Sequence, residues 1–250
     1  MATALDRPKA NPWQLKTPAG TPGHTSDRRQ PLVKICCIAS VEEARLAIGL
    51  GARALGLVSH IPSGPGVIPE ARIAEIAASV PPPTDTFLLT ALRTAEDIAR
   101  QHAVCRTSTI QLVDAVVPDE LAGLRQRLPA VKLVQVIHVL SDASVDEALQ
   151  AARIVDALLL DSGNPHLAVK ELGGTGRTHN WQISRRIREQ SPVPVFLAGG
   201  LRASNVRQAI DAVEPFGIDL CSSVRTDGHL DAGKLAAFMQ AVGPATPTCP

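Results

Sequence analysis

The chain has 250 residues, of which 45% are hydrophobic, so it can bury the core of one α/β barrel or of two smaller domains. A formal net charge of +1 and an aromatic content of 2% argue against a nucleic-acid-binding protein that relies on bulk charge or base stacking. Because no apolar run approaches the roughly 18 residues of a membrane span, and five cysteines lack a regular spacing, we expect a cytoplasmic protein without a membrane partner.

The first 30 residues are rich in proline, threonine, glycine and charge. A segment of this composition cannot bury enough apolar surface to offset the entropy lost on ordering. We therefore predict a disordered extension over residues 1–30, one folded domain over residues 31–242 and a flexible tail over residues 243–250.

Within the folded domain, short apolar runs alternate eight times with amphipathic runs. The predicted strands are Leu32–Cys36, Ala54–Ser59, Thr86–Thr90, Thr109–Val113, Leu133–Val139, Ala157–Leu160, Val193–Leu197 and Ile218–Cys221. The predicted helices are Val41–Leu50, Pro69–Ser79, Ala95–His102, Asp119–Arg127, Ser144–Ala152, Trp181–Gln190, Ala203–Val213 and Asp231–Ala241. Eight strand–helix repeats in a chain of this length favour a closed (β/α)8 barrel. Ser40 with Glu43, and Ser144 with Glu147, predict capping boxes.

In such a barrel the active site lies where the strands end. Side chains alternate along a strand, so Lys34 and Cys36 should point into the barrel while Val33 and Ile35 face the helices. Asp161 ends the sixth apolar run and is a second candidate. A free cysteine is most often a buried structural thiol, and a strand-end aspartate often forms a turn, so a structural role stays open for both.

Loops rich in glycine and hydroxyl groups follow the last three predicted strands. Their candidates for a phosphate site are Gly174, Thr175, Gly176, Gly199, Gly200, Ser222 and Ser223. Backbone N–H groups of such loops can approach an anion closely, and barrels often bind phosphate after strands seven and eight. A flexible connector is the alternative for the loop at Gly174. Further candidates for substrate binding are Lys34, His60, Gln111 and His138.

Five motifs stand in a characteristic order. They are Lys-Ile-Cys at 34–36, Leu-Leu-Asp-Ser at 159–162, Gly-Gly-Thr-Gly at 173–176, Leu-Ala-Gly-Gly-Leu at 197–201 and Asp-Leu-Cys-Ser at 219–222. In this order the chain resembles the phosphoribosylanthranilate isomerase family from about residue 32 to residue 241. The resemblance implies a single barrel, active as a monomer or homodimer on a small phosphorylated sugar. It also implies an Amadori rearrangement in tryptophan biosynthesis, without metal or cofactor.

The implied reaction needs an acid and a base. Opening the ribose ring asks for a proton on the ring oxygen, and the resemblance implies that Asp161 supplies it. A proton must then leave C2, and the resemblance implies that Cys36 removes it. A thiol acts as a base only as its thiolate, whereas the carboxylic acid must keep its proton near neutrality. Such opposed demands are typical of an acid–base pair.

The chain departs from the family pattern at the anthranilate end of the implied site. The family's arginine is missing from the loop at 62–67, and Val113 stands where a histidine is usual. Cys37 replaces a glycine, and Arg225 replaces a glutamate. Two alternatives therefore stay open: a related barrel isomerase acting on another phosphorylated sugar or aminosugar, and a catalytically silent barrel that binds a phosphosugar.

Overall fold

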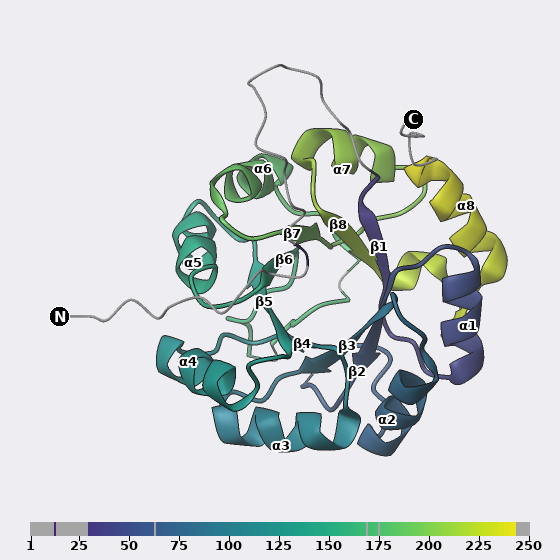
Figure 1. The fold of residues 1–250 in the computed structure, drawn as a ribbon. Coiled ribbons are helices and arrows are strands. Elements are labelled where there is room, and N and C mark those ends of the chain that lie inside the picture. The colour runs from purple at the N-terminus through teal and green to yellow at the C-terminus, as the bar shows by residue number, and fades with distance from the viewer. Residues whose placement is uncertain (1–12, 14–29, 63, 169, 175, 244–250) are drawn as a thin grey trace, which may run out of the picture.

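The computed structural model describes residues 13, 30–62, 64–168, 170–174 and 176–243. Among these residues, eight parallel strands close into a barrel surrounded by helices (Figure 1). The strands are β1 (Leu32–Ile35), β2 (Ala54–Val58), β3 (Asp85–Thr90), β4 (Thr109–Leu112), β5 (Lys132–His138), β6 (Ala157–Asp161), β7 (Val195–Leu197) and β8 (Gly217–Leu220). The helices are α1 (Val41–Gly49), α2 (Glu70–Ser79), α3 (Ala95–Cys105), α4 (Pro118–Arg127), α5 (Ala143–Ala151), α6 (Trp181–Gln190), α7 (Val206–Val213) and α8 (Ala232–Val242). The predicted (β/α)8 barrel is confirmed.

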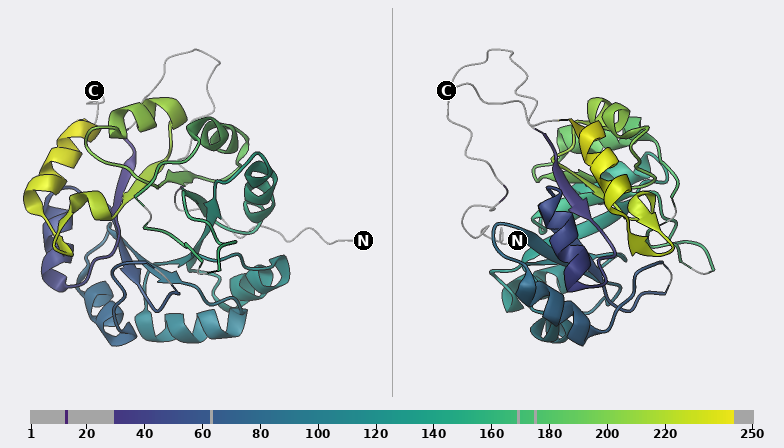
Figure 2. Two further views of the ribbon diagram at one scale, coloured as in Figure 1. Left: turned by 180° about the vertical axis from the view of Figure 1, so that it is seen from behind. Right: turned by 90° about the vertical axis from the view of Figure 1, so that its right-hand side faces the viewer.

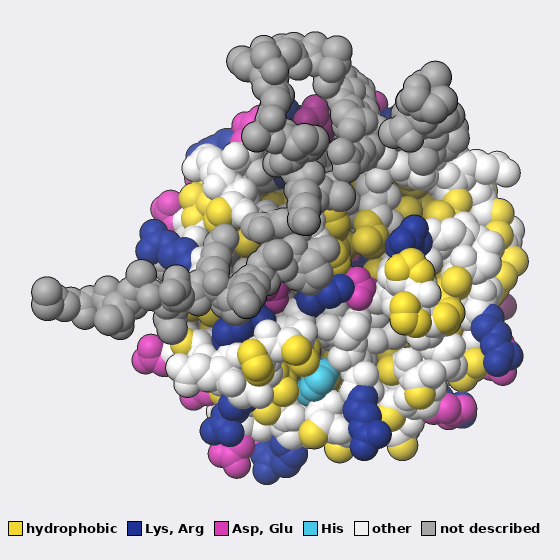
Figure 3. Space-filling model, viewed as in Figure 1, with side chains coloured by type: hydrophobic (Ala, Val, Ile, Leu, Met, Phe, Trp, Pro, Cys, Tyr) yellow, Lys and Arg dark blue, Asp and Glu magenta, His cyan; other side chains and the backbone are white. Residues whose placement is uncertain are grey.

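After β8 the chain adds elements that the apolar pattern did not predict. They are a short 3-10 helix, η1 (Ser222–Val224), and a hairpin of β9 (Arg225–Thr226) and β10 (His229–Leu230). Figure 2 shows the ring from behind and from the side. On the face drawn in Figure 3, basic and acidic side chains are interspersed, which agrees with the net charge of +1. Within the described part of the chain, no helix is both long and apolar enough to cross a membrane.

Strand alternation divides the buried side chains into two clusters. Val33 and Ile35 of β1 belong to the cluster between the strands and the helices. Cys36 belongs to the cluster inside the barrel, and Lys34 is fully buried. The predicted facing of this strand is therefore confirmed.

Trp13 lies at the barrel end where the strands begin. Its ring packs on Phe87 and Phe196, and its Nε1 donates a hydrogen bond to Asp85 at 3.1 Å. The ammonium of Lys132 lies 4.6 Å from the ring centroid. Buried in this way, Trp13 departs from the expected disordered extension. Residues 1–12 and 14–29 of the segment for which disorder was predicted lie outside the described residues. Residues 244–250 of the predicted flexible tail also lie outside them.

Half of the first predicted capping box forms, because the Glu43 carboxylate accepts from the N–H of Ala39 at 3.0 Å instead of from that of Ser40. Ser40 Oγ accepts a hydrogen bond from the backbone N–H of Glu43 at 3.2 Å, at the start of α1. The second prediction is wrong, because α5 begins one residue before Ser144. The Ser144 hydroxyl instead accepts from the N–H of Leu140 and donates to the carbonyl of His138, both at 3.2 Å. It stabilises the turn that follows β5.

Candidate active site

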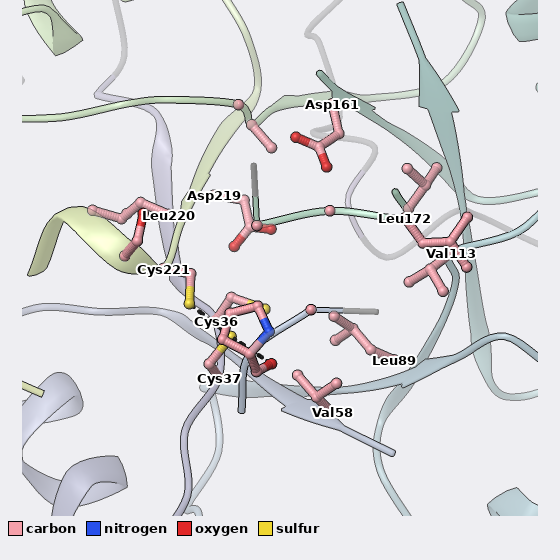
Figure 4. Close-up of a pocket in the computed structure, with 18 of the residues that line it drawn as sticks. Cys36, Cys37, Val58, Leu89, Val113, Asp161, Leu172, Asp219, Leu220 and Cys221 are labelled. Atoms are coloured by element: carbon pink, nitrogen blue, oxygen red, sulfur yellow. Dashed lines mark hydrogen bonds between the residues drawn. The ribbon is translucent and has the colours of Figure 1, made fainter. Parts of the chain in front are cut away.

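A cavity opens at the ends of the strands where the sequence placed the site (Figure 4). Its polar and sulfur-bearing lining residues are Cys36, Cys37, Gln111, Asp161, Asp219, Cys221 and Ser222. Much of its wall is apolar, with Val58, Leu89 and Val113 on one side. The cavity therefore combines a few ionisable groups with a surface that suits an apolar ring.

Cys36 and Asp161 reach this cavity from different strands. Cys36 follows β1 directly and Asp161 ends β6, and each is only 7% exposed. Burial raises the pKa of Asp161 above its ordinary value, against the opposing effect of hydrogen bonds from Ser162. A raised pKa favours the protonated acid, which is the form a proton donor needs.

Asp219 is a cavity residue that was not among the candidates predicted from the sequence. It faces Lys34 in register across the β1–β8 pair, and its carboxylate lies 2.9 Å from the Lys34 ammonium. Burial raises the pKa of Asp219, against the opposing effect of Lys34. The sequence signal that could have identified Asp219 is a carboxylate inside an otherwise apolar, buried strand. Its pairing with Lys34 could not be predicted, because the register of β1 with β8 depends on closure of the barrel.

Lys34 does not line the cavity but lies beneath it. Burial alone would lower its pKa, yet Asp219 and Cys36 raise it overall, so the ammonium keeps its charge. A Cβ added to Gly56 would lie 2.8 Å from the Cys36 sulfur and 3.0 Å from the Lys34 nitrogen. The cation and the thiol therefore share the space beside Gly56, where a positive charge stabilises a thiolate.

The predicted phosphate loops converge. Gly174, Gly176, Gly199, Gly200 and Ser222 all line the cavity. Ser223 does not line it, and Thr175 lies outside the described residues.

Gly200 has a φ of 59°, and a Cβ there would come within 2.6 Å of the Arg177 backbone. This position requires glycine, because the β6–α6 loop packs directly on it.

The β6–α6 loop covers the acid. Leu172 is buried and lines the cavity, and a Cβ on Gly173 would lie 3.2 Å from Asp161 Oδ2. The ammonium of Lys170 contacts the carboxylate of Asp114, two residues after β4, at 2.6 Å. The loop is thus held down over Asp161, and this shields the carboxyl from water.

The structure does not bring the two histidine candidates into the cavity. His60 is exposed, and His138 is buried with its Nε2 3.1 Å from the carbonyl oxygen of Val113. Gln111 does line the cavity. Among the described lining residues there is no arginine, lysine or histidine. Nor do the described residues include a group of three or more His, Cys, Asp or Glu side chains placed to hold a metal.

Arg225 fixes the turn after β1. Its guanidinium donates hydrogen bonds to the carbonyls of Cys36, at 3.1 Å, and Cys37, and it pairs with Glu43 at 3.2 Å. Cys37 adopts a φ of 63°, a left-handed conformation that is unfavourable for a residue with a side chain. Its Sγ lies 2.7 Å from that of Cys221. The sequence predicted neither contact, since the two cysteines are 184 residues apart.

Known proteins of one family are similar to this chain. The family model for N-(5'-phosphoribosyl)anthranilate isomerase matches residues 33–241. The N-(5'-phosphoribosyl)anthranilate isomerase of Halorubrum lacusprofundi is 34% identical over 216 residues, covering 84% of this chain and 96% of that protein.

Two solved structures are similar in fold. One is a phosphoribosylanthranilate isomerase in complex with reduced 1-(o-carboxyphenylamino)-1-deoxyribulose 5-phosphate, with a TM-score of 0.71 and 23% identity, covering 85% of this chain and 98% of that one. The other shows monomers generated from the dimeric enzyme of Thermotoga maritima, with a TM-score of 0.69 and 22% identity over the same shares of the two chains.

Proposed function

Since this chain belongs to the N-(5'-phosphoribosyl)anthranilate isomerase family, we propose that it converts N-(5'-phosphoribosyl)anthranilate into carboxyphenylamino-deoxyribulose phosphate in tryptophan biosynthesis. The observation that carries the proposal is the meeting of Cys36, Asp161 and the glycine loops in one cavity. The acid–base pair performs the chemistry, and the loops hold the phosphate.

In the first step Asp161 gives its proton to the ring oxygen of the ribose. The bond from that oxygen to C1 breaks while the nitrogen lone pair forms a C=N bond. The burial that raises the pKa of Asp161 keeps the donor protonated nearer to neutral pH. The covering β6–α6 loop keeps water away from the cation formed.

In the second step the Cys36 thiolate takes the proton from C2. The electrons of that C–H bond neutralise the iminium nitrogen, and the resulting enolamine tautomerises to the ketone. The Lys34 ammonium, held by Asp219 at 2.9 Å, stabilises the thiolate from beneath the cavity. We therefore assign Lys34 and Asp219 to positioning and charge. Because the proposed steps transfer only protons, they need no cofactor.

Phosphate binds at the backbone amides of the converging loops. Gly174, Gly176, Gly199 and Gly200 supply N–H groups without side chains that would obstruct an anion, and Ser222 adds an N–H group and a hydroxyl. A sulfate or phosphate soaked into a crystal should lie against the amide of Gly200. Anion density elsewhere, with none at Gly200, would contradict this assignment.

The anthranilate end supports a second candidate substrate. Because the described lining residues include no arginine, lysine or histidine, a carboxylate entering there has no cationic partner among them. The apolar wall of Val58, Leu89 and Val113 suits a ring without that carboxylate. The alternative substrate is a phosphorylated aminosugar whose nitrogen carries an uncharged group.

Two experiments separate these candidates. The gene should restore growth of a tryptophan auxotroph that lacks the isomerase, and Cys36→Ser should abolish the rescue. Steady-state kinetics should then compare phosphoribosylanthranilate with the matched aniline derivative, which lacks only the carboxylate. Failure of rescue together with efficient turnover of the aniline derivative would support the second candidate, and failure of both would contradict the proposed activity.

The same kinetics test the two histidines. If either one reaches the carboxylate in solution, His60→Ala or His138→Ala will raise KM for the anthranilate substrate but not for the aniline derivative. We further propose that the enzyme works in the cytoplasm as a monomer or homodimer. The free thiols of Cys36, Cys37, Cys105 and Cys221 and the dimeric neighbour from Thermotoga maritima support this proposal.

A further inference from the structure

The ends of β1 and β8 bring two thiols into contact that the proposed proton transfers do not use. Cys37 Sγ and Cys221 Sγ lie 2.7 Å apart in the cavity wall (Figure 4). Since a disulfide bond measures about 2.05 Å, bonding needs a movement of less than about 1 Å. We propose that Cys37 and Cys221 form a thiol-modification site, which a low-molecular-weight disulfide such as glutathione disulfide converts into a reversible intramolecular disulfide.

The two thiols are suited to different steps. Cys221 is partly exposed, and its pKa is lowered first by a hydrogen bond with Cys37 and then by the charge of Arg225. Cys37 is buried, and its pKa is raised by the same hydrogen bond and by burial. Because the thiolate is the nucleophile, Cys221 attacks first and Cys37 resolves.

The exchange balances in two steps. The Cys221 thiolate attacks one sulfur of the small disulfide, whose S–S bond breaks, and one small thiol leaves with the proton that Cys221 gave up. Cys37 then loses its proton and attacks Cys221 Sγ, which expels the second small thiol. Two protein thiols are oxidised to one disulfide, and the small disulfide is reduced to two thiols.

The backbone holds Cys37 in place before any oxidation. Its positive φ is maintained by the hydrogen bond from Arg225 to its carbonyl, and Glu43 holds Arg225 in turn. On the other side, Gly66 packs against Cys37, where a Cβ would lie 2.4 Å from that of Cys37. The thiol is therefore confined between the β2–α2 loop and Cys221, which favours the intramolecular product.

Oxidation should also change turnover, a consequence that rests on the proposed function. Cys36 precedes Cys37 directly, and Arg225 binds both carbonyls. Drawing Cys37 toward Cys221 therefore displaces the base. A misplacement of about 1 Å can lower a rate by about 10²-fold, so we expect a loss of up to about that size.

The test uses the full-length protein carrying Cys249→Ser, which leaves the four thiols of the described residues. After treatment with glutathione disulfide, titratable thiols should fall from four to two, the mass should fall by two hydrogens and dithiothreitol should restore both. Peptide mapping should join Cys37 to Cys221. Four remaining thiols, or a map that joins other cysteines, would overturn the proposal.

Variants in this background assign the roles. With Cys37→Ser, glutathione should stay attached to Cys221, and with Cys221→Ser no disulfide should form. Cys105→Ser is the matched control and should still form the disulfide, because Cys105 is buried on α3 with its pKa raised by burial to about 12. Cys36→Ser should also form it, and a loss of the disulfide there would show that Cys36 is the true partner.

Turnover is measured before and after oxidation. Absence of turnover in the reduced protein would count against the proposed function and leave the thiol result standing. Normal turnover of the fully oxidised protein would overturn the expected displacement of Cys36.

Discussion

The proposed reaction requires Cys36 as a thiolate and Asp161 as a neutral acid in the same cavity. Burial favours the neutral acid at Asp161 and so raises the pKa of this carboxyl. The Cys36 sulfur shares the space beside Gly56 with the Lys34 ammonium. Lys34 in turn keeps its charge because Asp219 pairs with it. The Lys34–Asp219 pair therefore keeps a cation next to the proposed base within the apolar interior.

The first prediction concerns the proposed base, Cys36, and the proposed acid, Asp161. Cys36→Ser and Asp161→Asn should each reduce kcat by about 10²-fold or more, because each removes one proton-transferring group while nearly conserving volume. The measurement is steady-state turnover of phosphoribosylanthranilate, with circular dichroism to check folding. Cys105→Ser, on α3, serves as the control and should keep normal turnover. A folded Asp161→Asn enzyme with near-normal kcat would show that another group donates the proton.

The second prediction concerns stability and pH. The pKa of Asp161 is raised on folding, so its stabilising effect is complete below the unfolded pKa of about 3.9 and is lost as pH rises through the folded pKa. Asp161→Asn, which stays neutral, should therefore be more stable than the wild type at pH 7, with a smaller difference near pH 4. Urea unfolding at the two pH values measures this.

Asp231→Asn is the matched control for that experiment. Hydrogen bonds from Thr226 and the start of α8 lower the pKa of Asp231, so its contribution has the opposite sign. This variant should gain no stability at pH 7. If Asp161→Asn also gains no stability, burial of the Asp161 carboxyl does not lower the unfolding free energy at pH 7.

At the scale of elements, the periodicity of apolar residues was enough to locate the strands and helices. Eight apolar runs became β1 to β8, because a strand buried on both faces needs a nearly continuous apolar segment. Alternation also placed Lys34 and Cys36 inside correctly. Loop positions followed in turn, and Gly174, Gly200 and Ser222 reached one cavity because parallel strands end at the same rim.

Contacts between distant elements could not be predicted in the same way. The pairing of Lys34 with Asp219 depends on the β1–β8 register. The approach of Cys37 to Cys221 depends on a positive φ that no local pattern indicated. His138 ends β5 as expected, yet its ring contacts the Val113 carbonyl instead of the cavity. Side-chain direction at a strand end is decided by the next turn, which periodicity does not describe.

The third prediction concerns the start of α6. His179 Nε2 contacts Ser184 Oγ at 2.7 Å, and burial lowers the His179 pKa to about 4. A folded pKa below the unfolded value of about 6.5 means that stability is present above pH 6.5 and is lost as pH falls toward 4. The difference corresponds to about 3 kcal/mol across that interval.

His179→Gln should remove this dependence. Between pH 7 and pH 4, the wild type should lose about 3 kcal/mol more unfolding free energy than the variant, as measured by urea titration. His60→Gln, at an exposed position, should behave like the wild type. Equal losses in the wild type and His179→Gln would mean that His179 titrates normally in the folded protein.

On the scale of the whole molecule, the two ends of the barrel differ in construction. The end where strands finish carries glycine loops and ionisable groups around a cavity. The opposite end is filled by Trp13, which packs on Phe87 and Phe196 in the same cluster that contains Cys36. One continuous core therefore runs from the beginning of the strands to the floor of the site. A defect at the closed end should change stability more than chemistry.

The last prediction tests this separation. Trp13→Ala removes a side chain that is only 7% exposed, and leaves Asp85 without the 3.1 Å hydrogen bond from its indole. Replacing a buried tryptophan by alanine costs about 3–5 kcal/mol, so the unfolding free energy should fall by about 3 kcal/mol, because this site lies at the edge of the core. Trp13→Phe keeps an aromatic ring in place and loses mainly the hydrogen bond, and should cost about 1 kcal/mol. Both variants should keep the wild-type kcat below their melting temperatures. If Trp13→Ala unfolds at the wild-type urea concentration, the indole does not close this end of the barrel in solution.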